Sequence, residues 1–186
     1  MNKLKSVLAV LAVAALAYTA TAQDTNSLKT QIGQLEARTS IVIIKGSTLM
    51  GSIPIDGGQL AVRCKQTVDT GTGETSYGLA IEIENNGFPH ERTLVDDTEV
   101  EGLLGAVDYL MKINSDATPL TGFEATFSTK AGLRVIADSV RKDGGILTYL
   151  QIEDYPRVSL TSVQMTQLYN LIAQCQKSLD KLKATK

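Results

Sequence analysis

Residues 92–113 of this chain read RTLVDDTEVEGLLGAVDYLMKI, and a related pattern, RVSLTSVQMTQLYNLIAQCQKSL, follows at residues 157–179. The second stretch begins 65 residues after the first, at Arg157 against Arg92. Each starts as the end of an apolar strand and then places apolar residues three and four apart, as an amphipathic helix does. At this offset, apolar residues coincide in three helical pairs: Val100 with Met165, Leu103 with Leu168, and Val107 with Ile172.

Polar residues at the start of each predicted helix have the spacing of a capping box. Asp96 precedes Glu99 by three residues, and Thr161 precedes Gln164 by the same number. In a capping box, each of the two side chains hydrogen-bonds a backbone N–H at the helix start that lacks a partner. The sequence therefore predicts two strand–cap–helix units of the same design.

Alternating and β-branched segments precede both predicted helices and indicate strands. The N-terminal part of the mature chain adds a short helix, capped by Asn26 or Ser27, with Leu28, Ile32 and Leu35 on one face. Strands are predicted at residues 40–45, 48–55, 60–65, 77–84 and 93–95, and then at residues 120–128, 132–137, 150–153 and 158–160.

The predicted fold is α+β, with tandem β-β-β-β-α repeats related by pseudo-twofold symmetry. Antiparallel sheets would pack with the two amphipathic helices, after a short helix and strand at residues 23–47. The first repeat would span residues 48–114 and the second residues 115–186. Neither repeat can cover both its sheet and its helix alone, so we expect one compact domain with a shared core.

This order of elements resembles that of the Whirly and PUR-type nucleic-acid-binding proteins, whose units run four strands and then a helix. The resemblance covers the mature chain and involves no shared motif. It implies single-strand binding through a basic sheet surface, here a stripe with Arg63, Lys65 and Arg134. Composition points the other way, because the chain has a net charge of −2, no Trp and only three Phe.

Residues 1–22 have the pattern of a cleaved secretory signal. Lys3 and Lys5 precede the apolar run at residues 7–17, and the small residues at 20–22 suit a signal peptidase. Cleavage after Ala22 would leave a mature chain that starts at Gln23, without the cysteine of a lipid-anchored protein. The sequence thus predicts a periplasmic or secreted protein with no membrane span after cleavage.

The two cysteines, Cys64 and Cys175, fall on the apolar faces of a predicted strand and a predicted helix. We expect both to be buried. They are either two separate core thiols or the two halves of a disulfide, since an exported chain meets an oxidising environment.

The last helix carries a narrow apolar seam with residues alternately three and four apart. Such a seam packs in a core or, where it remains exposed, against a second copy in a homodimer. The residues that could form a homodimer interface are Met165, Leu168, Ile172 and Leu179.

The catalytic signals are short. Residues 69–71 read Asp-Thr-Gly, the triplet of aspartic proteases, which need two such loops. A hydrolase using the loop carboxylates of Asp69 and Glu74 is one hypothesis. The acidic residues near Asp96 suit the first turn of a helix rather than a cation site. No cofactor or metal site is predicted.

A loop before the first long helix gives the best binding candidates. This loop is about four residues longer than its counterpart at residues 154–156, and such differences between repeats often lie at functional loops. Phe88, His90 and Arg92 are therefore the candidate binding residues. The leading hypothesis is an exported, non-enzymatic binding or structural-interaction module for an unknown protein or small ligand. The alternatives are an extracytoplasmic hydrolase and a single-stranded nucleic-acid-binding protein.

Overall fold

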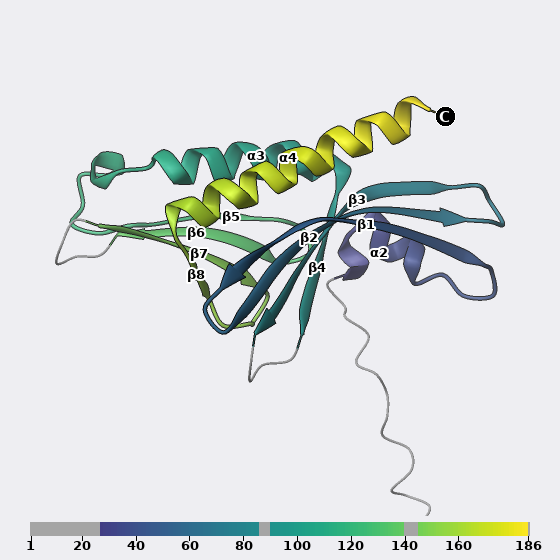
Figure 1. The fold of residues 1–186 in the computed structure, drawn as a ribbon, viewed down its shortest axis with the longest axis horizontal. Helices are drawn as coiled ribbons and strands as arrows, with labels where there is room; N and C mark the ends of the chain where they lie inside the picture. The colour runs from purple at the N-terminus through teal and green to yellow at the C-terminus, as the bar shows by residue number, and fades with distance from the viewer. Residues whose placement is uncertain (1–26, 86–89, 140–144, 186) are drawn as a thin grey trace, which may run out of the picture.

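A computed structural model describes residues 27–85, 90–139 and 145–185 (Figure 1). The predicted signal sequence, residues 1–22, lies outside the described residues. The described chain is α+β, with two four-stranded antiparallel sheets and three α-helices. Among the helices described, none has the length and apolar character that crossing a bilayer requires.

Sheet A contains β1 (Ile43–Ile55), β2 (Gly58–Asp69), β3 (Thr75–Asn85) and β4 (Glu91–Asp96), in that order. The turn between β1 and β2 uses Gly57 at a φ of 73°, a conformation that glycine adopts without steric cost. The two strands predicted at 40–45 and 48–55 are wrong in one respect, because they form one strand. Gly46 pairs with Gln66 and continues the ladder, and the only irregularity in this pairing is a bulge between Leu49 and Gly51.

Sheet B contains β5 (Glu124–Ser128), β6 (Leu133–Ser139), β7 (Ile146–Ile152) and β8 (Val158–Leu160), again in sequence order. Its longest strands, β6 and β7, have seven residues each, whereas β1, β2 and β3 of sheet A have 13, 12 and 11. The strand predicted from residue 120 begins only at Glu124, after the short 3-10 helix η3 (Ser115–Ala117) and an irregular segment.

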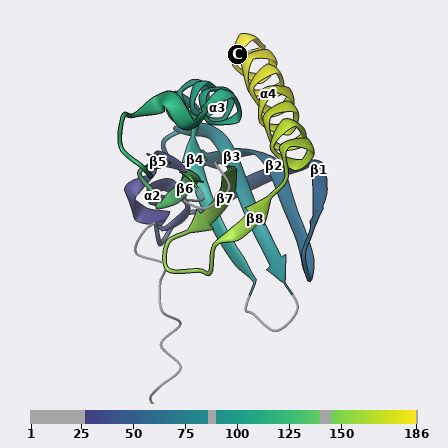
Figure 2. The ribbon, with the colours of Figure 1, turned by 90° about the vertical axis from the view of Figure 1, so that its left-hand side faces the viewer.

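The helices α3 (Asp97–Lys112) and α4 (Ser162–Ala184) lie side by side on the same side of both sheets (Figures 1 and 2). Helix α4 follows sheet B in the chain but packs mainly on β1, β2 and β3 of sheet A. Helix α3 follows sheet A and contacts strands of both sheets. Each long helix therefore covers strands from the other half of the chain, which makes the two halves one unit.

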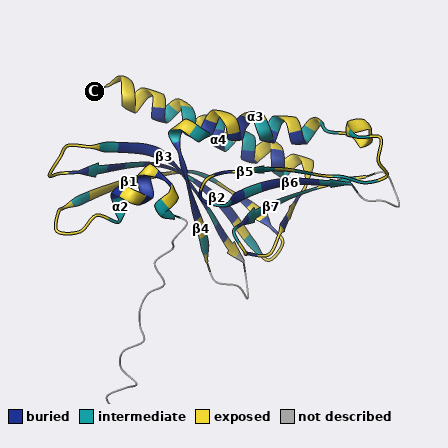
Figure 3. Ribbon diagram, turned by 180° about the vertical axis from the view of Figure 1, so that it is seen from behind, coloured by how far each residue is buried: buried dark blue, intermediate teal, exposed yellow. Residues whose placement is uncertain are grey.

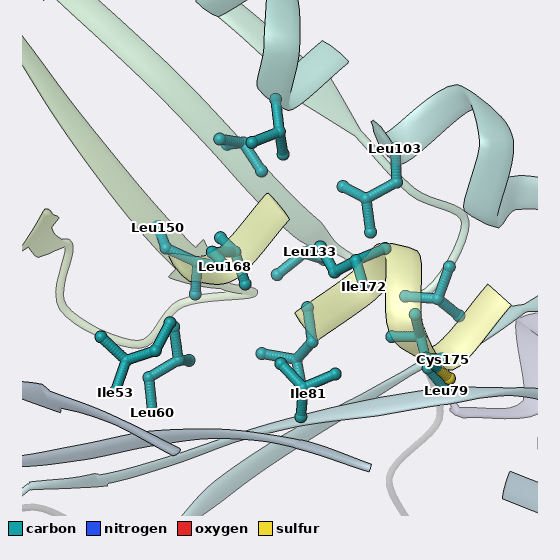
Figure 4. Close-up of a cluster of buried hydrophobic side chains, with 14 of the residues drawn as sticks. Ile53, Leu60, Leu79, Ile81, Leu103, Leu133, Leu150, Leu168, Ile172 and Cys175 are labelled. Carbon is teal, nitrogen blue, oxygen red and sulfur yellow. The ribbon is translucent and has the colours of Figure 1, made fainter. Parts of the chain in front are cut away.

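One hydrophobic core lies between the two sheets and the two long helices (Figure 4). Leu60 and Ile81 from sheet A meet Leu133 and Leu150 from sheet B, and all four are 0% exposed. The buried faces of α3 and α4 point into this core, and their polar faces point to solvent (Figure 3).

The apolar seam of α4 belongs to this core. Met165, Leu168 and Ile172 are 0% exposed and Leu179 is 1% exposed. A homodimer through this seam requires that the seam be exposed. These four side chains are not exposed, because sheet A and α3 cover them.

The opposite face of sheet A, which we call the outer face, carries the short helix α2 (Gln31–Glu36), preceded by the 3-10 helix η2 (Ser27–Lys29). Thr30 caps α2, and not Asn26 or Ser27, because its hydroxyl accepts a hydrogen bond from the Gly33 N–H. Ile32 packs on Ala80 and Leu94 in a second, small cluster.

The start of α3 differs from prediction, whereas the start of α4 confirms it. Thr161 and Gln164 form the complete capping box. Asp96 makes no bond to the first turn of α3. Its carboxylate instead accepts hydrogen bonds from the backbone N–H groups of Gln31 and Ile32, at 2.9 and 3.2 Å. It therefore joins the end of β4 to the start of α2.

Candidate binding site

The outer face of sheet A holds a charged cavity of about 340 Å³, which we call the basic cavity. Strand alternation explains its location, because the residues that line it on β2 alternate with core residues such as Leu60, Val62 and Cys64. Four cationic and two acidic side chains line it, which gives a local net charge of +2. The lining residues are Glu36, Lys45, Ser47, Arg63, Lys65, Glu82 and Arg92.

A buried carboxylate organises one side of the basic cavity. Glu36, the last residue of α2, receives the Lys65 ammonium at 2.5 Å and the Lys45 ammonium at 3.3 Å. The Thr67 hydroxyl donates to the same carboxylate at 3.3 Å. The side chains of Lys65 and Glu36 are only 6% and 9% exposed.

The pKa of Glu36 is the outcome of opposing effects. Burial, the largest single effect, raises the pKa of Glu36, since it disfavours the charged carboxylate. The hydrogen bond from Lys65 and the charges of both lysines together outweigh burial, so the net shift of the pKa is downward. Glu36 is therefore ionised at neutral pH and holds both ammonium groups in place.

The other side of the basic cavity contains two arginines beside one carboxylate. Arg63 donates to Glu82 through Nε at 2.7 Å. Arg92 stands opposite Glu82 in the β3–β4 register and is exposed. No carboxylate within residues 27–85, 90–139 and 145–185 forms an ion pair with Arg92. Its guanidinium offers a planar fork of donors that suits a carboxylate or phosphate.

Of the three predicted binding residues, the structure describes two, and only one of these lines the basic cavity. Arg92 lines the basic cavity. His90 lies just before β4, with Nε2 3.8 Å from a carboxylate oxygen of Glu84 on β3, and its side chain is 48% exposed. Phe88 lies outside the described residues. Sequence reasoning missed Glu36, Lys45 and Glu82, although the alternation of the strands that carry Lys45 and Glu82 indicated one shared face.

The carboxylates of the hydrolase hypothesis lie elsewhere, at the β2–β3 hairpin. They converge on one cation, because Arg38 contacts Asp69 at 2.6 Å and Glu74 at 2.5 Å. Asp69 also accepts hydrogen bonds from the backbone N–H groups of Gly71 and Thr72. The hydrogen bond from Arg38 is the main cause of the lowered pKa of Asp69. This arrangement stabilises the ionised carboxylate of Asp69. The role of Asp69 is therefore to hold the hairpin closed.

Other predicted groups also have structural partners. Arg134 lies on sheet B and donates to the Glu153 carbonyl at 2.7 Å, so it is not among the residues that line the basic cavity. Asp97 pairs with Lys183, and Glu99 accepts from the Lys130 N–H. In the part of the chain that the structure describes, no three His, Cys, Asp or Glu side chains are placed to hold a metal ion.

A larger cavity of about 440 Å³ lies between the end of α3, β7, β8 and the start of α4. Within the described residues, no charged side chain lines it, and its Thr161 and Thr166 hydroxyls already form hydrogen bonds in the first turns of α4. The basic cavity is the stronger candidate despite its smaller volume, because its polar groups converge and one of them, Arg92, is available to a ligand.

Comparison of the chain with known protein families, with curated proteins and with solved structures found no match.

Proposed function

We propose that this chain is an exported, non-enzymatic binding module that holds an anionic ligand in the basic cavity. The observation that supports this proposal most is Arg92, an exposed guanidinium at a cavity with a local net charge of +2. The chain as a whole is acidic, with a net charge of −2, so this concentration of cations contrasts with the average composition.

The buried pair of Lys65 and Glu36 supports the same proposal. Well-packed apolar residues of similar volume generally stabilise a fold at least as well as a buried ion pair does. A role of these charges in ligand binding explains the pair better than a contribution to the stability of the fold does. Glu36 fixes the two ammonium groups at the cavity wall, so a bound anion would find them already oriented.

Isothermal titration calorimetry of the mature chain with citrate and with inorganic phosphate tests the proposal. We expect binding at low ionic strength that weakens as salt is added, since the attraction is between exposed charges. Arg92→Ala should weaken binding about tenfold, the effect of losing about 1.4 kcal/mol from one charge-assisted contact.

A matched control is Lys112→Ala. Lys112 is an exposed lysine on α3, paired with Asp108, and it does not line the basic cavity. We expect its affinity to stay within twofold of the unchanged chain. If neither anion binds at low ionic strength, or if both variants weaken binding equally, the basic cavity is not an anion site.

A second candidate function is single-strand nucleic-acid binding, favoured by the cations Arg63, Lys65 and Arg92 on the outer face of sheet A. This function is the one that the resemblance to Whirly and PUR-type proteins implies, if the chain consists of tandem β-β-β-β-α repeats with pseudo-twofold symmetry. Fluorescence anisotropy with a labelled oligothymidylate separates the two functions. Binding whose logarithm falls steeply with the logarithm of salt concentration would favour nucleic acid. Binding of citrate without binding of the oligonucleotide would favour a small anion.

Export is proposed from the sequence of residues 1–22. Fractionation of cells that express the full chain, followed by intact-mass measurement, tests it. We expect the protein in the envelope or culture fluid with Gln23 as its first residue. A cytoplasmic product that retains residues 1–22 would contradict export.

A further inference from the structure

Two cysteines from distant parts of the chain meet inside the core. Cys64 lies on β2 of sheet A and Cys175 on α4, and both are free thiols. The Cys175 thiol donates a hydrogen bond to the Gly78 carbonyl oxygen of β3 at 4.0 Å. The next residue of β3, Leu79, stands opposite Cys64 in the strand register, so the two thiols lie in the same part of the core. Helix α4 packs on β2, and Cys175 points from the helix into the core beside Leu79 (Figure 4).

The two thiols differ in their access to solvent. Cys175 is 0% exposed. Cys64 lines a cavity of about 320 Å³ between the last turns of α4 and strands β1 and β2. Met50, Lys181 and Leu182 are among the other residues that line this cavity. A small reagent that enters the cavity therefore meets Cys64 before Cys175.

The chemical environment also favours Cys64 over Cys175 as the reactive thiol. The neighbouring Cys175 side chain is the main cause of the lowered pKa of Cys64, although burial opposes this shift. The neighbouring Cys64 side chain and burial both raise the pKa of Cys175. The thiolate is the nucleophilic form of cysteine, so Cys64 is the better attacking group of the two.

We propose that Cys64 and Cys175 form a redox-active pair whose substrate is a small disulfide that enters the cavity beside α4. Cys64 attacks, and Cys175 resolves the mixed disulfide. This activity is independent of the basic cavity, which lies on the opposite face of sheet A.

The exchange balances in two steps. The Cys64 thiolate attacks one sulfur of the small disulfide RSSR, the S–S bond of RSSR breaks, and the first RS⁻ leaves and takes up the proton lost from Cys64. Cys175 then loses its proton and attacks the Cys64 sulfur, and the second RS⁻ leaves with that proton. The protein is oxidised by two electrons to an internal disulfide, and RSSR is reduced to two RSH.

The internal disulfide would connect sheet A to α4 across a loop of more than 100 residues. A cross-link of that length restricts the unfolded chain strongly. The oxidised form should therefore melt at a higher temperature than the reduced form, by several degrees and up to roughly 10 °C.

The experiment uses the mature chain, first reduced and then exposed to oxidised glutathione. Cys64→Ser and Cys175→Ser are its two variants. We expect the unchanged chain to lose two hydrogen atoms and to show a Cys64–Cys175 cross-linked peptide by mass spectrometry. Cys175→Ser should accumulate a glutathione adduct on Cys64, because the resolving thiol is gone. Cys64→Ser should stay unmodified while it remains folded, because Cys175 is inaccessible.

Reaction of Cys175 in folded Cys64→Ser as fast as that of Cys64 in Cys175→Ser would overturn the proposal. So would cross-links between two copies of the chain instead of within one. If a serine variant fails to fold, as judged by circular dichroism, timed alkylation of the unchanged chain decides the matter. Trapping the mixed disulfide first on Cys64 supports the proposal, and trapping it first on Cys175 refutes it.

Discussion

The starts of α3 and α4 have the same sequence spacing but different structures. At α4, the Gln164 N–H donates to the Thr161 hydroxyl at 3.3 Å, and the Gln164 side chain accepts from the Thr161 N–H at 2.8 Å. At α3, the Asp96 carboxylate turns away from its own helix and accepts from Gln31 and Ile32 of α2.

The difference shows that Asp96 hydrogen-bonds the helix start that has less support from other contacts. Helix α2 has only six residues, too few to be stable alone, and its first N–H groups are partly or fully buried. The start of α3 has other support, because α3 is 16 residues long and packs on both sheets. Asp96 is therefore a tertiary contact, whereas Thr161 is a local one.

Asp96→Ala should give the largest effect among the changes that test this comparison. It leaves two backbone N–H groups without an acceptor, at a position that is 1% exposed, and it removes one of the contacts that hold α2 on sheet A. We expect a loss of about 2–4 kcal/mol in the free energy of unfolding, measured by urea denaturation.

Asp96→Asn is the matched control, because it keeps one side-chain oxygen as an acceptor. Its loss should be clearly smaller than that of Asp96→Ala. Hydrogen exchange should also show faster exchange at the Gln31 and Ile32 amides in Asp96→Ala, with the α3 amides less affected. Equal acceleration in both helices would contradict the assignment of Asp96 to α2.

Thr161→Ala should cost less, about 1 kcal/mol in the free energy of unfolding, the usual value for the loss of a helix N-cap. Thr161 is exposed, so the substitution leaves no cavity in the core. Thr161→Ser keeps the hydroxyl acceptor and should cost only a few tenths of a kcal/mol. A loss from Thr161→Ala as large as that from Asp96→Ala would break the distinction between local and tertiary caps.

Glu99→Ala tests the second residue of the capping box that was predicted at the start of α3 but does not form there. Glu99 accepts from the Lys130 N–H at 2.9 Å, but no group in the described ranges hydrogen-bonds its second, buried carboxylate oxygen. Removal of that oxygen offsets part of the free energy that is lost with the hydrogen bond to Lys130. We therefore expect the free energy of unfolding, measured by urea denaturation, to fall by only about 0.5 kcal/mol. A loss above that of Thr161→Ala would show that Glu99 supports α3 more than its contacts indicate.

Lys183→Met should give the smallest effect, and it depends on pH. Lys183 at the end of α4 pairs with Asp97 at the start of α3 at 2.8 Å, and both side chains are partly exposed. The hydrogen bond to Asp97 is the main cause of the raised pKa of Lys183. Because the pKa is higher in the folded state, the pair stabilises the fold below the unfolded pKa of lysine and loses this effect as pH rises through the folded value.

We therefore expect Lys183→Met to cost a few tenths of a kcal/mol at neutral pH, and we expect this cost to shrink as the pH rises above the ordinary pKa of lysine. Lys177→Met is the control, since Lys177 is an exposed lysine on the same helix. Denaturation curves at neutral and alkaline pH measure the difference. A larger cost at alkaline pH than at neutral pH would contradict the ion pair as the cause.

Local patterns in the sequence predicted the long elements well. The three apolar pairs aligned between the two helical stretches, such as Val100 with Met165, are all 0% exposed. Asp96 stands directly before α3 (Asp97–Lys112), at the N-cap position that the sequence predicted for it. These features depend on backbone periodicity, which neighbouring residues determine.

The candidate binding site was predicted only in part. Arg92 was found because its loop is longer than the corresponding loop at residues 154–156. Glu36 and Lys65 meet only because α2 docks on the outer face of sheet A, and no local pattern contains that docking. Gly78 shows how close this docking is, since an added Cβ would lie 2.5 Å from Ile32 and 2.1 Å from the Val95 carbonyl oxygen.

The sequence by itself determined the α+β class, the two amphipathic helices and the burial of both cysteines. Periodicities of 2.0 and 3.6 follow from the geometry of single strands and helices. Only the tertiary structure decided which helix Asp96 caps, which lysines Glu36 holds and that Cys64 and Cys175 lie in the same part of the core. Each of these joins residues far apart in the chain, so it depends on sheet register, helix docking and competition for a limited number of hydrogen bonds.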